Sequence, residues 1–167
     1  MDRRRSLITL FGLALFAGGT RPALSRAATK PTLVKSKAEW ARLLAAPAYA
    51  VLFEDATERA GTSPLNREQR DGTYVCAACY QPLFDSATKF ESGTGWPSFW
   101  QPLEDALGTR TDFKLILPRK EYHCRRCGGH QGHVFDDGPK PTGKRYCNNG
   151  VALVFVPRDE KLPELRT

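Results

Sequence analysis

The sequence predicts a single, mainly β domain that is held together by a bound metal ion. The chain has 167 residues, which suits one domain, and 41% of them are hydrophobic, which is enough for a core. From residue 73 onward, short apolar runs separated by glycine and proline indicate strands and turns. Two Cys-x-x-Cys pairs, Cys76 with Cys79 and Cys124 with Cys127, have the spacing of structural zinc ligands.

Residues 1–27 have the pattern of an export signal. Three arginines form a basic head, residues 7–17 are mostly apolar, and small residues flank a predicted cleavage point near Ala27. The apolar stretch is too short to cross a bilayer as a helix of about 20 residues. Arg4 and Arg5 favour the twin-arginine route over general secretion, and an uncleaved anchor or a basic tail is the alternative. We therefore expect an exported protein of the bacterial periplasm, without stable membrane association once the leader is removed.

The positive charge of the chain is concentrated in this leader. The full sequence carries a net charge of +7, whereas residues 28–167 hold 20 basic and 17 acidic residues, a net charge of +3. A nucleic-acid partner inferred from charge alone thus loses its main support. We expect a monomer that binds no nucleic acid.

One short helix is predicted at the start of the domain, which we place at residues 36–158. Residues 28–35 form a flexible lead-in, and Ser36 with Glu39 makes a capping-box pattern. Apolar side chains at helical spacing then predict a helix over Lys37–Ala46, ended by Pro47. Residues 54–72 are polar and predict a long loop with room for a helical turn.

Strands are predicted over the rest of the domain. Apolar or alternating runs place them at residues 73–75, 113–117, 134–135 and 151–156. The last of these is strongly apolar and follows Cys147 closely, so it gives that residue a rigid base. Residues 159–167 are charged and are expected to be frayed.

The two cysteine pairs predict a clamp across the domain. Because 44 residues separate Cys79 from Cys124, the pairs are too far apart in sequence for a simple zinc ribbon. Each pair can present two thiolates to one tetrahedral ion, so we expect one structural zinc. Disulfides and a redox-active Cys-x-x-Cys are the alternatives.

Cys147 is the one cysteine outside these pairs and is a candidate nucleophile. A nucleophilic thiol needs a proton donor or acceptor nearby, and the chain offers His123, His130 and His133. Gly132 would allow a sharp turn between the last two. The rival hypothesis is a second, catalytic metal, held by His130 and His133 with either Cys147 or the second cysteine pair, as in a zinc hydrolase.

Residues 93–100, Gly-Thr-Gly-Trp-Pro-Ser-Phe-Trp, predict a shaped loop. Aromatic side chains usually belong to a core, but here they alternate with glycine, proline and serine. Trp96 on such a loop can be either a core residue or one wall of a small apolar pocket.

Three segments, taken together, resemble the methionine-R-sulfoxide reductase family, MsrB. They are residues 89–99, residues 130–135 and residues 137–147, and the paired cysteines stand in register with them. The similarity extends from about Trp40 to Pro157, and several long motifs occur in the same order.

The resemblance implies a β-tent of two antiparallel sheets, with a structural zinc away from the active site. It implies thiol-dependent reduction of methionine R-sulfoxide in oxidised proteins, in which Cys147 attacks the sulfoxide sulfur and becomes a sulfenic acid. By the same resemblance Trp96 holds the substrate methyl group, and His130 and His133 help to protonate the oxygen. The remaining matches are Asn149, expected to be catalytic, and Phe135 and Arg145, expected to bind the substrate.

The chain also departs from the family pattern. Thr94 stands where many members carry a second, resolving cysteine, so an external thiol, such as a thioredoxin-like protein, is expected to reduce Cys147. Gln131, Asn148 and Gly150 replace a usual leucine, isoleucine and serine. The alternative function is a non-catalytic zinc module of the same fold that binds a partner protein.

Overall fold

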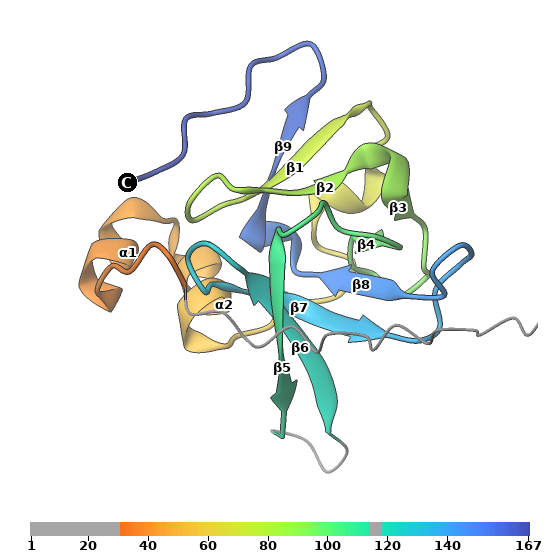
Figure 1. The fold of residues 1–167 in the computed structure, drawn as a ribbon, viewed down its shortest axis with the longest axis horizontal. Helices are drawn as coiled ribbons and strands as arrows, with labels where there is room; N and C mark the ends of the chain where they lie inside the picture. The colour runs from red at the N-terminus through yellow and green to blue at the C-terminus, as the bar shows by residue number, and fades with distance from the viewer. Residues whose placement is uncertain (1–30, 114–117) are drawn as a thin grey trace, which may run out of the picture.

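The computed structural model describes residues 31–113 and 118–167, and the predicted export signal lies outside these ranges. The described chain consists of two short helices and two antiparallel sheets (Figure 1). The helices are α1 (Lys37–Leu43) and α2 (Ala46–Glu54), and 3-10 turns lie at Pro64–Arg67, Ser86–Thr88 and Gly150–Ala152. None of the helices in the described ranges is both long and apolar enough to cross a membrane.

The prediction of a mainly β fold with two antiparallel sheets is confirmed. The smaller sheet has the order β2-β1-β9, with β1 (Gly72–Cys76), β2 (Pro82–Asp85) and β9 (Leu153–Pro157). The larger sheet has the order β3-β4-β8-β7-β6-β5. Its strands are β3 (Lys89–Phe90), β4 (Ser98–Phe99), β5 (Leu107–Asp112), β6 (Arg119–Cys124), β7 (His130–Phe135) and β8 (Arg145–Asn148).

The N-terminal helix is shorter than predicted, and a second helix follows it. Ser36 and Glu39 form the expected capping box, but α1 ends at Leu43. Pro47 does not end a helix, because it lies in the first turn of α2. Proline is tolerated there, since the first-turn N–H groups have no partner within the helix. The indole ring of Trp40 stacks on Phe53 at 5.0 Å and joins the two helices.

Two predicted strands compare differently with the structure. The strand expected at 113–117 falls mostly on residues 114–117, which lie outside the described ranges; Phe113 is 75% exposed and belongs to no strand, and β5 ends just before it, at Asp112. β5 is polar, and its position follows from its pairing with β6, from Leu107 opposite Cys124 to Asp112 opposite Arg119. The strand expected at 151–156 begins at Leu153, because Gly150–Ala152 forms a 3-10 turn.

The C-terminal tail has no regular structure beyond the turn that follows β9, but the predicted fraying does not hold at Arg166. The backbone N–H of Arg166 donates to the carbonyl of Cys79, and the guanidinium of Arg126 donates to the carbonyl of Arg166. The Arg166 guanidinium also lies over the ring of Tyr80 at 4.4 Å. The tail therefore packs beside one of the two cysteine pairs.

A cluster of aromatic rings fills the core and joins the two sheets. Phe84 of β2 stacks on Phe99 of β4 at 4.2 Å, and Tyr74 of β1 meets Phe99 edge-on at 4.9 Å. Tyr122 of β6 contacts Tyr146 of β8 at 5.3 Å, directly beside Cys147. Burial of such rings is strongly stabilising, so β8 rests on a rigid base.

Candidate active site and metal clamp

The four paired cysteines, here called the clamp, come together from two matched turns. Cys76 ends β1 and Cys124 ends β6, and the second cysteine of each pair lies in the turn that follows. In one turn Tyr80 N–H donates to the Cys76 carbonyl at 2.9 Å, and in the other Gly128 N–H donates to the Cys124 carbonyl at 2.8 Å. Both donors have a positive φ, 62° and 76°. The two halves of the clamp thus share one backbone conformation.

The clamp has the geometry of a tetrahedral metal site. Its four buried sulfur atoms all lie within 4.8 Å of one another, with Cys76 3.7 Å from Cys127 and Cys79 3.5 Å from Cys124. A zinc ion bound at about 2.3 Å places its sulfur ligands about 3.8 Å apart, so the residues fit such an ion. All five cysteines are free thiols, which disfavours the disulfide alternative.

A second metal site is not supported. Across residues 31–113 and 118–167, the clamp is the one cluster of three or more cysteine, histidine or carboxylate groups whose ligand atoms lie close enough together for an ion. His130, His133 and Cys147 form no such cluster. The catalytic-zinc hypothesis therefore has no geometry behind it within those residues.

A cavity of about 110 Å³ brings most of the predicted active-site residues together. Its walls include Trp96, His133, Phe135, Cys147 and Asn149. Four residues that were not singled out for the site complete the lining: Thr57, Arg119, Gly132 and Asn148. His130 and Arg145 do not line it. A larger hollow of about 280 Å³ lies around Tyr74 and Lys89 and contains no cysteine, so the chemistry belongs to the smaller cavity.

Cys147 occupies the middle of β8 and is partly accessible from the cavity. Burial raises the pKa of its thiol above the ordinary 9.0, while the Thr94 hydroxyl and the positive charge of Arg145 oppose that rise. The Thr94 oxygen lies 4.0 Å from the sulfur. At neutral pH the resting group is therefore the thiol.

A β-bulge in β7 sets the positions of the two histidines. Tyr122 pairs with Gly132 whereas His123 pairs with His130, so Gln131 is the extra residue. Side chains three apart on a regular strand point to opposite faces, but here the His130 and His133 rings lie 5.4 Å apart. Gly132 makes no turn; it is needed because a Cβ atom there would meet the Cys147 carbonyl oxygen at 1.9 Å.

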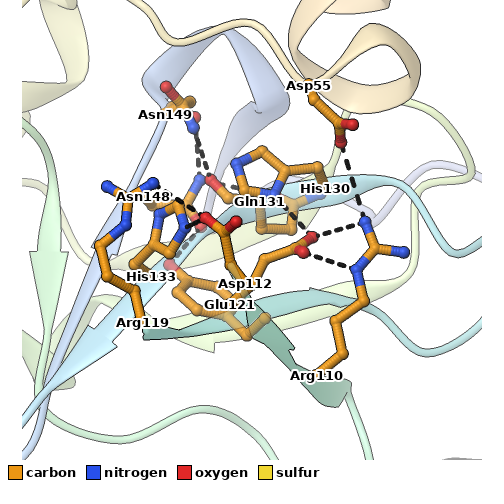
Figure 2. Close-up of polar contacts among 11 residues, drawn as sticks. Asp55, Arg110, Asp112, Arg119, Glu121, His130, Gln131, His133, Asn148 and Asn149 are labelled. Carbon is orange, nitrogen blue, oxygen red and sulfur yellow. Dashed lines mark hydrogen bonds and ion pairs between the residues drawn. The ribbon is translucent and has the colours of Figure 1, made fainter. Parts of the chain in front are cut away.

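Each histidine is held by its own carboxylate (Figure 2). The imidazole Nε2 of His133 lies 2.8 Å from Asp112 of β5, which also accepts from Arg119 at 2.8 Å. Burial lowers the pKa of His133 below the ordinary 6.5, and the Asp112 contact opposes that shift. The imidazole Nδ1 of His130 lies 2.7 Å from Glu121 of β6. His130 thus stands behind His133, and its part in proton delivery stays a prediction.

Glu58 ties Trp96 and Asn149 together. The indole N–H of Trp96 donates to the Glu58 carbonyl at 2.9 Å, and the Glu58 N–H donates to the Asn149 side chain at 2.9 Å. The Glu58 carboxylate accepts the backbone N–H of Gly150 at 2.6 Å. These contacts fix two cavity walls from a loop whose sequence gave no sign of such a role, because Glu58 is one polar residue among many.

Arg145 braces Phe135 from outside the cavity. Its buried guanidinium donates two hydrogen bonds of 2.8 Å to Asp137 and lies over the Phe135 ring at 4.3 Å. A cation stacked on a ring holds both groups in place. Arg145 therefore supports the apolar wall and does not line it.

Replacing Glu121 with glutamine is expected to lower the free energy of unfolding at pH 7 by about 2 kcal/mol, because a buried carboxylate loses charged hydrogen bonds. Burial raises the pKa of Glu121, but the His130 and Arg110 contacts outweigh it and hold the pKa at about 2 instead of 4.5. The stabilisation is thus complete above about pH 4.5 and is lost as the pH falls toward 2.

Urea unfolding of both proteins from pH 7 to pH 2 checks this prediction for Glu121. The exposed Glu104→Gln exchange is the matched control and should change little at any pH. A difference between wild type and E121Q that stays constant over the whole range would contradict the assigned role of the carboxylate.

Comparison with known proteins places this geometry in a family. Residues 44–157 match the family model described as the SelR domain. Relatives named peptide methionine sulfoxide reductase MsrB are among the matches. That of Methanosarcina barkeri is 49% identical over 75% of this chain and 89% of its own, and that of Leptospira interrogans is 49% identical over 72% and 93%. The relative from Pseudomonas putida is 50% identical over 75% of this chain and 95% of its own.

Proposed function

The chain belongs to the SelR domain family, and from that premise we propose that it reduces methionine R-sulfoxide in proteins. One observation carries the proposal. An accessible thiol, Cys147, shares a small cavity with the indole of Trp96 and the imidazole of His133. A methionine sulfoxide side chain needs these three surroundings: an apolar wall for its methyl group, a nucleophile for its sulfur and a proton source for its oxygen.

The chemical step transfers one oxygen atom to the enzyme. The Cys147 sulfur attacks the electrophilic sulfoxide sulfur and forms a sulfur–sulfur bond. The oxygen then passes to the Cys147 sulfur: a Cys147 S–O bond forms while the sulfoxide S–O bond and the new sulfur–sulfur bond break, and methionine leaves as the thioether. Cys147 keeps the oxygen as a sulfenic acid, so the sulfoxide gains two electrons and the thiol sulfur loses two. The oxygen is a poor leaving group until it is protonated, which is why the proton is needed.

His133 is placed to manage that proton. It pairs directly with Cys147 across strands β7 and β8, and both side chains line the cavity. Asp112 fixes the orientation of the ring. As the sulfur attacks, the thiol proton must leave Cys147, and transfer by way of His133 to the sulfoxide oxygen completes the reaction without a change in total charge.

The rate of this first step is expected to be flat near neutral pH. The active form is the Cys147 thiol beside a neutral His133 imidazole, which share one transferable proton. This form prevails between the lowered pKa of His133 and the raised pKa of Cys147. The acid limb of the single-turnover rate of methionine release should therefore lie at a lower pH than the ordinary histidine pKa of about 6.5, and the alkaline limb at a higher pH than the ordinary cysteine pKa of about 9.

Asp112→Asn provides the control for this profile. The Asp112 contact raises the pKa of His133, so the variant should move the acid limb to lower pH and leave the alkaline limb in place. An acid limb that does not move would mean that His133 is not the group responsible.

Reduction of the sulfenic acid is assigned to a thiol from outside the chain. Among the described cysteines, the other four are committed to the clamp. An external thiol attacks the Cys147 sulfur and releases water, and a second thiol then cleaves the mixed disulfide. Thr94, on the Trp96 loop, lies 4.0 Å from the sulfur, but it has a hydroxyl and cannot take this part.

Thr94→Cys is expected to supply an internal partner. The Thr94 oxygen is 4.0 Å from the Cys147 sulfur, so a thiol there needs only a small rotation to form a disulfide. After one turnover the variant should lose two titratable thiols and gain no dimedone adduct, whereas wild type and the Thr94→Ser control should form the adduct. A dimedone adduct in the variant as strong as in wild type would contradict this.

We assign zinc to the clamp and a structural role to it. The ion would be held by Cys76, Cys79, Cys124 and Cys127, which join the end of β1 to the end of β6. Four cysteine ligands leave no open position for substrate, so the ion supplies folding energy and no catalytic chemistry.

We also propose export to the bacterial periplasm, supported by the basic and apolar pattern of residues 1–27. N-terminal sequencing of the protein recovered from a periplasmic fraction tests this, and an intact Met1 would contradict cleavage.

Turnover of separate R and S epimers of a methionine sulfoxide peptide tests the proposed function. Dithiothreitol and then thioredoxin serve as reductants, and R-specific reduction is the expected result. Metal bound at one ion per chain without turnover of either epimer would favour the non-catalytic module instead.

A further inference from the structure

Two buried amide side chains lie between the clamp and the active-site cavity. Gln131 and Asn148 are 0% and 1% exposed, and the Asn148 amide nitrogen lies 3.3 Å from the Gln131 side-chain oxygen. Figure 2 shows both residues beside His130 and His133, with the Asn148 and Asn149 side chains directed toward Gln131. Buried amides are costly unless their hydrogen bonds are satisfied, so the pair calls for a physical account.

The hydrogen bonds of this pair run in one direction. A metal-bound thiolate can only accept, so the 3.4 Å contact to Cys76 requires the Gln131 nitrogen as donor. The Gln131 oxygen is then left to accept from Asn148, whose own oxygen accepts the Tyr122 hydroxyl at 2.8 Å. The clamp sulfur thereby fixes the orientation of both amides.

The other end of this chain of hydrogen bonds reaches the reactive segment. Asn148 follows Cys147 and lines the cavity, and its amide nitrogen also donates to the Asn149 carbonyl at 2.8 Å. The main-chain carbonyl of Gln131 accepts two hydrogen bonds from Asn149, one from the backbone N–H at 2.9 Å and one from the side-chain amide at 3.0 Å. Gln131 therefore holds both residues that follow the nucleophile.

We propose that Gln131 and Asn148 form a positioning relay that couples the metal clamp to the Cys147–Asn149 segment. With the ion bound, the Cys76 sulfur orients Gln131, Gln131 orients Asn148, and the segment keeps the nucleophile and Asn149 in the cavity wall. Neither amide acts on the substrate. The catalytic side of the relay rests on the proposed function, whereas its effect on metal retention does not.

Coupling of this kind predicts that each residue affects the site it does not touch. Asn148 contacts no clamp sulfur in the described structure, yet Asn148→Leu should speed metal release to a chromogenic chelator about fivefold. Gln131 does not line the cavity, yet Gln131→Met should lower kcat about fivefold with KM changed less than twofold. Both replacements are close to isosteric, so they remove hydrogen bonds with little change in volume.

The double variant is the decisive measurement. Once one amide is lost, the other has already lost its partner, so the double variant should be no worse than the worse single variant in either readout. Effects that multiply would overturn the relay. Tyr122→Phe is a milder variant that removes only the distal hydroxyl, and it should speed metal release about twofold; an unchanged rate would also count against the relay.

Val156→Ala controls for a general loss of stability. Val156 is buried in β9 and pairs with Thr73 of β1. Within the described residues it has no hydrogen bond to Gln131, Asn148 or Tyr122. If this variant releases metal as fast as Asn148→Leu at a matched free energy of unfolding, the relay is wrong. If wild type fails to reduce either sulfoxide epimer, the proposed function is wrong. The metal-release rates of the two single variants and the double variant then still decide whether Gln131 and Asn148 are coupled to the clamp.

Discussion

Replacing Cys147 with serine is expected to lower methionine sulfoxide reduction by at least about a thousandfold. A hydroxyl is a far weaker nucleophile than a thiol, and it has no counterpart to the sulfenic acid that holds the transferred oxygen. The side chains differ by one atom, and Cys147 is not part of the clamp, so fold and metal content should stay as in wild type. Epimer-resolved turnover with dithiothreitol as reductant measures the loss.

Two further measurements make this result specific. Dimedone should label wild type once per chain after exposure to substrate without reductant, and it should leave C147S unlabelled. Ala41→Ser, at an exposed position of α1 that does not line the cavity, is a control exchange to serine and should retain turnover within a few fold. Retained activity in C147S would rule out Cys147 as the nucleophile.

Removing the metal is expected to unfold the domain. A structural zinc contributes on the order of 10 kcal/mol, which is comparable to the whole stability of a small domain. The clamp joins β1 of the smaller sheet to β6 of the larger sheet. Without an ion, only contacts between four buried thiols would hold the two strands together there. We expect a strong chelator to abolish the near-ultraviolet circular dichroism signal, and added zinc to restore it.

Single replacements in the clamp give a second measure of the same effect. Cys79→Ser should bind less than one ion per chain and should lower the free energy of unfolding by several kcal/mol, while Cys147→Ser binds one ion as wild type does. A protein that keeps its circular dichroism and its thermal midpoint after the metal has been removed would show that the clamp is not structural.

The clamp and the candidate nucleophile could be predicted from the sequence because they depend on residue type and local spacing, whereas the reaction is implied by the family resemblance. Two Cys-x-x-Cys pairs can each fold into the same turn, and the structure brings all four sulfur atoms together. The predicted wall residues Trp96 and Phe135 line the cavity with Cys147. The capping box at Ser36 is likewise a local pattern, and it starts α1 as expected.

Element boundaries were less predictable where long-range pairing decides them. β5 is polar, and it is a strand because β6 pairs along its full length. The sequence pattern predicts that Pro47 ends a helix, yet Pro47 lies in the first turn of α2, where proline is equally acceptable. In both places local preference is weak, so tertiary contacts determine the outcome.

By itself the sequence predicted the nucleophile and the four metal ligands from cysteine type and spacing, and its resemblance to a known family indicated the class of reaction. Only the tertiary structure decided how the site is supported. The bulge at Gln131 turns His130 and His133 to one side, Glu121 reaches them from the adjacent strand β6 and Asp112 from β5 beyond it, and Glu58 arrives from a distant loop. These contacts arise from strand register and from burial across segments far apart in the chain, which no local pattern encodes.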